Sequence, residues 1–180
     1  PLRWNPLQIP KRIDPVRYRT LLVELFANAG RMGPRQLGFM REALTRVYAQ
    51  TGVIIPEEDS GMFDDIWKDK NLSQTRKDQY YRNLEEWKYV RNDEEERVIN
   101  AARSERGFPA ESYIHVRLDA LAAFERQALV IQRSKRASLA QWVDILRALL
   151  RKHANDINSR SSLQGVLLRV EQLAEGEMRR

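Results

Sequence analysis

The stretch "DPVRYRTLLVELFANAG", residues 14–30, decides the fold class of this chain. Asp14 stands where it can cap a helix, and Pro15 takes the first helical position, where a missing amide donor is tolerated. Apolar side chains then recur at helical spacing before Gly30 ends the pattern, at Tyr18, Leu21, Leu22, Leu25, Phe26 and Ala29. The stretch therefore predicts a helix with one face in a core.

The same pattern recurs further along the chain. A turn at Gly33 and Pro34 leads to a second predicted helix, residues 35–52, and so short a connection makes the two helices antiparallel neighbours. Three more helices are predicted at residues 112–132, 138–154 and 161–176, each with one apolar face. Outside the first residues no segment alternates like a strand, so the sequence predicts an all-α fold, an irregular bundle of about six helices.

The middle of the chain is less regular. Residues 53–72 contain Pro56, Gly61 and several acids, and are predicted as a loop with a short helical turn. Residues 74–107 carry a thin apolar stripe, and "RNDEEER" at residues 91–97 contains no apolar side chain. This segment is either one solvent-bridging helix or two helices broken near Asn92 and Asp93.

Composition limits the classes of protein that fit. The 180 residues include no cysteine, which excludes disulfides and thiolate metal sites and suits the cytoplasm. No apolar run approaches the ~20 residues that span a bilayer, so no membrane contact is expected. The length fits one helical domain, which we assign to residues 14–180, preceded by an extended, proline-rich strip at residues 1–13.

The sequence argues against an enzyme. It contains no GxxxxGK[ST] phosphate loop, no GxSxG elbow and no HExxH motif, and its two histidines, His115 and His153, have no second metal ligand nearby. The acids at residues 93–96 point in several directions on a helix, which is typical of a solvated face. We therefore expect no catalytic residue and no metal site.

The net charge of +6 raises the possibility of a polyanionic partner. The candidates for phosphate contact with nucleic acid come from a turn between two predicted helices and from the polar side of the second: Arg133, Lys135, Arg136, Arg147, Arg151 and Lys152. The alternative is an ordinary solvated surface, with cations that complement the helix macrodipole.

Two segments resemble a known family. Residues 2–10, "LRWNPLQIP", and the following residues 13–54 are similar to the region after the Walker A half of the motor in HerA-type and TraG-type coupling-protein ATPases of the FtsK/HerA superfamily. In that family an Asn-Pro-Leu strip leaves the nucleotide-binding sheet and leads into an inserted all-helical domain. Residues 159–176, "SRSSLQGVLLRVEQLAEG", are similar to the segment through which such insertions return to the sheet.

The resemblance implies a non-catalytic helical insertion domain of a hexameric, DNA-translocating or DNA-processing ATPase. ATP and Mg would bind only in the parent core, because the family's Walker A lysine, Walker B acid and arginine finger have no counterpart here. Residues 1–12 would make few contacts within the domain, and four of them would dock on that core: Trp4, Asn5, Pro6 and Leu7. The implied partners are the parent core and neighbouring subunits, with weakly bound DNA or a docked protein in addition. The alternative is a self-contained helical adaptor without a motor.

Overall fold

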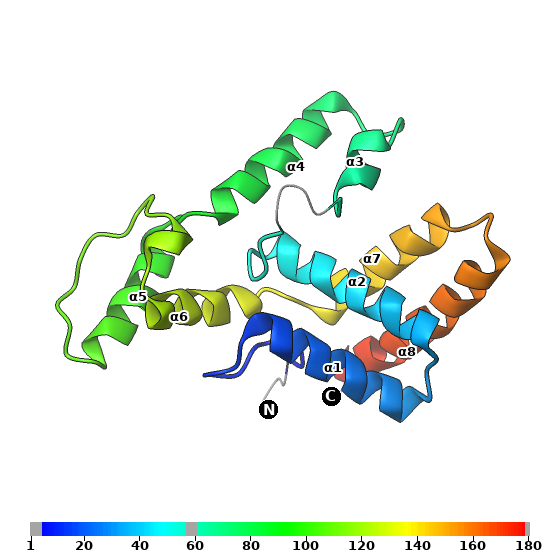
Figure 1. Cartoon of the computed structure of the whole chain (residues 1–180), viewed down its shortest axis with the longest axis horizontal. Coiled ribbons are helices and arrows are strands. Elements are labelled where there is room, and N and C mark those ends of the chain that lie inside the picture. Colours follow the sequence, from blue (N-terminus) through cyan, green and yellow to red (C-terminus); the bar gives the residue numbers. More distant parts are fainter. Residues whose placement is uncertain (1–4, 57–60, 179–180) are drawn as a thin grey trace.

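A computed structural model describes residues 5–56 and 61–178 (Figure 1). The described residues form eight α-helices: α1 (Pro15–Gly30), α2 (Pro34–Gln50), α3 (Asp64–Lys68), α4 (Gln74–Trp87), α5 (Asp93–Ser104), α6 (Ala123–Ser134), α7 (Leu139–Lys152) and α8 (Ile157–Met178). A 3₁₀ turn, η1 (Leu118–Ala120), precedes α6, and this part of the chain contains no β-strand. The prediction of an all-α irregular bundle is confirmed, with eight helices in place of about six.

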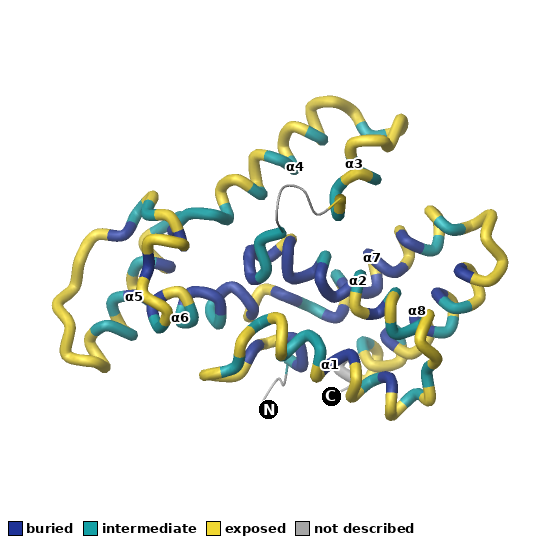
Figure 2. Tube along the Cα trace, viewed as in Figure 1, coloured by how far each residue is buried: buried dark blue, intermediate teal, exposed yellow. Residues whose placement is uncertain are grey.

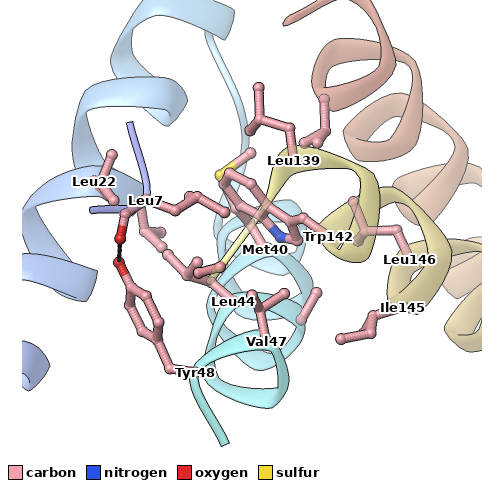
Figure 3. Packing of buried hydrophobic residues seen from close by; sticks show 14 of the residues in the cluster. Leu7, Leu22, Met40, Leu44, Val47, Tyr48, Leu139, Trp142, Ile145 and Leu146 are labelled. Carbon is pink, nitrogen blue, oxygen red and sulfur yellow. Dashed lines mark hydrogen bonds between the residues drawn. The ribbon is translucent and has the colours of Figure 1, made fainter. Parts of the chain in front are cut away.

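Helices α1, α2, α7 and α8 form the main body around one apolar cluster. Asp14 caps α1 and Ser138 caps α7, each with a side-chain oxygen that accepts a backbone amide of the first turn, at 3.0 and 3.2 Å. α7 packs against both α2 and α8, and its Trp142 is fully buried close to Met40 in Figure 3. This packing fixes the last turn of α7 beside α2.

The N-terminal strip belongs to this body. Leu7 and Ile9 are buried in the main cluster, and the Tyr48 hydroxyl donates a hydrogen bond to the carbonyl of Leu7 at 2.8 Å (Figure 3). Residues 1–12 are expected from the sequence to make few contacts within the domain, and for residues 5–9 that expectation is wrong. The physical reason is that two large apolar side chains leave water by entering this core.

Helices α5 and α6 form a second lobe with its own apolar cluster. The buried members of this cluster come from both helices and from the segments before and between them: Val90, Ile99, Tyr113, Leu118, Leu121 and Leu129. α6 contributes Leu129 to this cluster and Val130 to the cluster of the main body. α6 therefore packs in both lobes and helps to connect them.

Residues 105–122, between α5 and α6, are not helical apart from η1, so the helix predicted at 112–132 begins at Ala123 instead. The backbone of this segment pairs with the residues that follow α4. The Val90 amide donates to the carbonyl of Val116 at 2.8 Å, and the Leu118 amide donates to the carbonyl of Lys88 at 2.9 Å. These hydrogen bonds replace the helical ones that the apolar spacing predicts.

The polar segment at residues 74–107 is two helices rather than one. α4 ends at Trp87, and Asn92 starts α5 by accepting the amide of Glu95 on its side-chain oxygen at 3.0 Å. Neither α3 nor α4 contains a buried residue, and Figure 2 shows both as exposed or half-buried throughout. We call residues 64–87, which comprise these two helices, the arm.

Candidate functional site

A cleft of about 900 Å³ separates the arm from the main body. α2 and the last turns of α7 form one wall, and the arm forms the other. The charged residues that line the cleft come from both walls: Arg46, Arg151 and Lys152 from the body, and Asp64, Asp65, Lys68 and Asp69 from the arm. Burial of the apolar face of α7 fixes the orientation of this helix, so that Arg151 and Lys152 lie at this edge.

Asp65 lies at the centre of the charged groups. Its Oδ2 accepts a hydrogen bond from Arg46 Nη1 at 2.7 Å and lies 3.6 Å from Lys152 Nζ, while Arg46 Nη2 also donates to Glu42 at 2.9 Å. Burial alone would raise the pKa of the Asp65 carboxyl, but the hydrogen bond and charge of Arg46, with Lys152, lower it overall. Burial also raises the pKa of the nearby Tyr80 hydroxyl. Asp65 is therefore ionised at neutral pH and links the two walls.

The three cations predicted on α7 are exposed, and two of them have carboxylate partners. Arg147 Nη2 lies 2.8 Å from Glu171, and Lys152 pairs with Asp65. Arg151 lines the cleft and forms no ion pair with a described residue. Exposed ion pairs contribute only about 0–1 kcal/mol, so these cations can exchange partners.

Arg133 is fully buried, and its prediction as a phosphate contact is wrong. Its Nε and Nη2 donate to the Glu95 carboxylate at 3.0 and 3.2 Å. Its Nη1 donates to the carbonyls of Gly52 and Trp87 at 3.1 and 2.6 Å, and Nη2 also donates to the carbonyl of Tyr89 at 2.7 Å. Burial lowers the pKa of Arg133 against the opposing charge of Glu95. Since all five donors of the guanidinium are used, it fastens α6 to α5 and to the ends of α2 and α4.

The strip residues predicted to dock on a separate core make contacts within this chain instead. The side-chain amide of Asn5 donates a hydrogen bond to the carbonyl of Ala137 at 2.8 Å. The carbonyl of Pro6 accepts a hydrogen bond from the Tyr18 hydroxyl at 2.8 Å. Leu7 is fully enclosed by the main cluster, so its predicted docking role is wrong. Trp4, the fourth member of that set, lies outside the described residues.

The strip also brings new cations to the turn between α6 and α7. The Ile9 amide donates to the Ser134 hydroxyl oxygen at 3.0 Å, which fixes the strip against the C-terminal end of α6. Two cations follow Ile9 within three residues, and two follow Ser134 directly. We call these four residues the basic junction: Lys11, Arg12, Lys135 and Arg136.

All four side chains of the basic junction are exposed. Arg136 lies 3.5 Å from Glu94, while the other three form no ion pair with a carboxylate in the described part of the chain. Arg12 adopts a φ of 68°, a left-handed conformation that residues other than glycine seldom adopt. Sequence reasoning found Lys135 and Arg136 but missed Lys11 and Arg12. The sequence shows that Lys11 and Arg12 are adjacent cations. It does not show that the strip packs against the end of α6, beside Lys135 and Arg136.

Neither histidine lines the cleft or belongs to the basic junction. The His153 ring packs edge-on against Phe39 with centroids 5.4 Å apart, and His115 is exposed in the segment before η1. Residues 5–56 and 61–178 contain no group of three or more His, Cys, Asp or Glu side chains that could hold a metal ion. In the same residues, every helix is too short or too polar to cross a membrane.

Comparison with known proteins assigns neither a family nor a function to this chain. No protein-family model matches this sequence, and no curated protein or solved structure is significantly similar to it. These comparisons therefore neither support nor contradict any function for the chain.

Proposed function

We propose that this chain is a non-catalytic helical domain that contacts the phosphate backbone of nucleic acid through the basic junction. The observation that carries the proposal is that the Ile9–Ser134 hydrogen bond brings together two distant segments with four exposed cations, of which only Arg136 pairs with a described carboxylate. Phosphate contacts release counterions and supply affinity without base information. The junction therefore suits guidance of a strand or duplex rather than recognition of a sequence.

We assign the domain to a hexameric DNA-translocating or DNA-processing ATPase of the HerA or TraG type, acting in the cytoplasm. The resemblance of residues 2–54 to that family supports this assignment. An inserted domain needs its two ends near each other. The Tyr18 hydroxyl of α1 bonds to the carbonyl of Pro6 in the strip, and Val170 of α8 shares the main cluster with Leu7. ATP and Mg would bind in the parent core, while residues of this chain bind and orient the nucleic acid.

A self-contained helical adaptor for a protein partner is the second candidate. A smaller hollow of about 320 Å³ favours it, because apolar side chains, including Phe63 and Leu84, line much of this hollow between α4 and residues 55–56 and 61–64, beside a few charged ones. In that case the chain binds a protein side chain there and has no affinity for nucleic acid. Measurement of nucleic-acid binding therefore separates the two candidates.

Fluorescence anisotropy with a short labelled duplex and the matching single strand tests the proposal. We expect a Kd of about 10⁻⁴ to 10⁻⁶ M near physiological salt, without sequence preference, because one domain engages few phosphates. The affinity should fall as salt rises, with a log–log slope of about −0.9 per phosphate on the duplex and about −0.7 on the single strand.

Two charge-matched double variants locate the contact. Arg12→Glu with Lys135→Glu reverses one cation on each side of the junction and should flatten the slope on duplex by about two phosphate contacts. Arg82→Glu with Arg160→Glu makes the same change of net charge on α4 and α8, and should leave the slope unchanged. Equal losses in the two variants would contradict a contact at the junction, and no binding at low salt would favour the adaptor.

A further inference from the structure

The two walls of the cleft carry opposite charge. Among the described residues that line it, the carboxylates all come from the arm: Asp64, Asp65 and Asp69. The body wall supplies cations and no carboxylate: Arg46 from α2, and Arg151 and Lys152 from α7. The arm also contributes Lys68, which pairs with Asp64 of the same helix at 3.1 Å. The arm thus presents an acidic face to a basic one.

Asp65 makes the direct contact between these faces. Its carboxylate is shared between Arg46 at 2.7 Å and Lys152 at 3.6 Å, which belong to different helices of the body. Arg46 also keeps a partner on its own helix, Glu42 at 2.9 Å, and this contact does not depend on the arm. The body wall therefore holds two cations around one anionic group.

α3 is fastened to α4 more than to the body. The Trp67 ring packs edge-on against Tyr81 with centroids 5.8 Å apart, and the Phe63 ring packs against Tyr80 at 5.1 Å. Lys77 Nζ donates to the carbonyl of Trp67 at 2.8 Å. These contacts join the two helices of the arm and persist if the arm moves away from the body as a unit.

We infer that the α2–α7 wall is a second phosphate site and that Asp65 occupies it in place of a phosphodiester. A carboxylate and a phosphodiester both offer paired anionic oxygens to a guanidinium and an ammonium group, so one can replace the other. The inference rests on the proposed function, because the ligand is the same nucleic-acid backbone. The inference adds that the phosphate backbone of the nucleic acid must displace the arm before it can reach Arg46 and Lys152.

The first measurement is the affinity of the full chain for a labelled duplex. Asp65→Asn removes the internal anion, and should raise the affinity several-fold and steepen the salt slope by about one to two phosphates, or about −0.9 to −1.8. Asp69→Asn is the matched control, because it makes the same change of net charge on the same wall at a residue without an ion pair to the body. It should give a smaller gain in affinity and no change in slope.

The second measurement reports the position of the arm. Since the chain contains no cysteine, spin labels can be attached cleanly at Asn83→Cys on α4 and Ala140→Cys on α7, both exposed positions. Double electron–electron resonance should show a longer distance between the two spin labels in Asp65→Asn than in the wild type or in Asp69→Asn. Saturating duplex should lengthen the same distance in the wild type.

A third variant separates this inference from the proposed function. In a chain that already carries Arg12→Glu and Lys135→Glu, Asp65→Asn should still raise affinity, and adding Lys152→Glu should abolish that gain. If Arg12→Glu with Lys135→Glu binds the duplex as tightly as the wild type, that result contradicts the proposed function and leaves the inference about Asp65 standing. The inference is overturned if Asp65→Asn and Asp69→Asn behave alike, if the arm opens without a gain in affinity, or if polyglutamate opens the arm and duplex does not.

Discussion

Replacing Arg133 with methionine should lower the free energy of unfolding by at least about 4 kcal/mol. Methionine keeps the apolar stem but removes the guanidinium, which leaves the Glu95 carboxylate fully buried without a cation. Removal of one member of a buried ion pair costs about 3–5 kcal/mol. The carbonyls of Gly52, Trp87 and Tyr89 lose their donor as well, and an unsatisfied buried acceptor costs about 1–3 kcal/mol.

A loss of this size is large for a single domain. Native domains are stable by about 5–15 kcal/mol, so Arg133→Met removes a substantial share of the total. For a chain of this length each kcal/mol shifts the Tm by about 2–4 °C, and the variant should melt roughly 8–16 °C lower. The fall should affect both lobes, because the guanidinium joins α5, the end of α4 and the turn after α2 to α6.

Urea unfolding, followed by far-ultraviolet circular dichroism and tryptophan fluorescence, measures the effect. Arg136→Met is the control, since it lies three residues later, is exposed and pairs with Glu94 only at 3.5 Å. It should change the free energy by less than about 1 kcal/mol. Combining Arg133→Met with Glu95→Met removes the unpaired charge and should recover at least about 2 kcal/mol relative to Arg133→Met alone.

Two results would refute this reasoning. A cost below about 1 kcal/mol for Arg133→Met would mean that Glu95 finds water or another cation and is not held dry by the fold. A double variant no more stable than Arg133→Met would mean that the loss comes from packing rather than from the buried carboxylate.

Four further predictions concern single features of the fold and its surfaces. Leu7→Ala should destabilise the domain by about 2–5 kcal/mol in urea unfolding, because the side chain is fully buried, and an unchanged Tm would mean that the strip is a separate link. Gly52→Ala should lower the Tm measured by calorimetry, because Gly52 has a φ of 71° and a Cβ there would collide with the Trp87 ring; an unaltered melting curve would contradict that geometry. The pKa of Asp65 is lower in the folded chain than in the unfolded chain, where it is near 4. Its ion pairs therefore stabilise the closed arm fully above the unfolded pKa, and this stabilisation is lost as the pH falls through the folded pKa. Hydrogen exchange of α3 should therefore be slower in the wild type than in Asp65→Asn at neutral pH, and should approach the rate of Asp65→Asn as the pH falls below about 4. Equal rates in the two at neutral pH would count against the contact. Calorimetric titration should detect no micromolar ATP binding, because the backbone cradle and lysine of a phosphate loop are missing from the sequence, and a one-to-one isotherm would overturn that expectation.

Local signals predicted much of the main body. Asp14, Pro15 and Gly30 mark the ends of α1, and a capping serine marks the start of α7, because each acts on the backbone within one turn. The prediction of a helix in the segment before α6 was wrong because the structure there depends on distant contacts rather than on local signals. The apolar residues of this segment have helical spacing, but Val90 and the residues beside it offer the backbone other partners, and these tertiary hydrogen bonds prevail over local preference.

The candidate site depended on contacts that no local pattern contains. Arg133 belongs to a run of basic residues that looks solvated, and its burial depends on Glu95 of a different helix and on three backbone carbonyls from other segments. Lys11 and Arg12 became part of a surface because Ile9 bonds to the end of α6. Asp65 was one acid among several in an irregular segment until α2 and α7 supplied its two cations.

The ionic contacts of this domain differ in exposure, and this difference separates folding from binding. The Arg133–Glu95 pair is removed from water and is screened little by salt, whereas the junction and the Asp65 contacts are partly or fully exposed and are screened within a few ångströms at high ionic strength. Added salt should therefore weaken nucleic-acid binding and loosen the arm while the fold persists. The two surface effects oppose each other, because salt that releases Asp65 also screens Arg46 and Lys152 from phosphate. A phosphodiester competes best for these cations where counterion release is most favourable, so the arm should regulate binding most strongly at low salt.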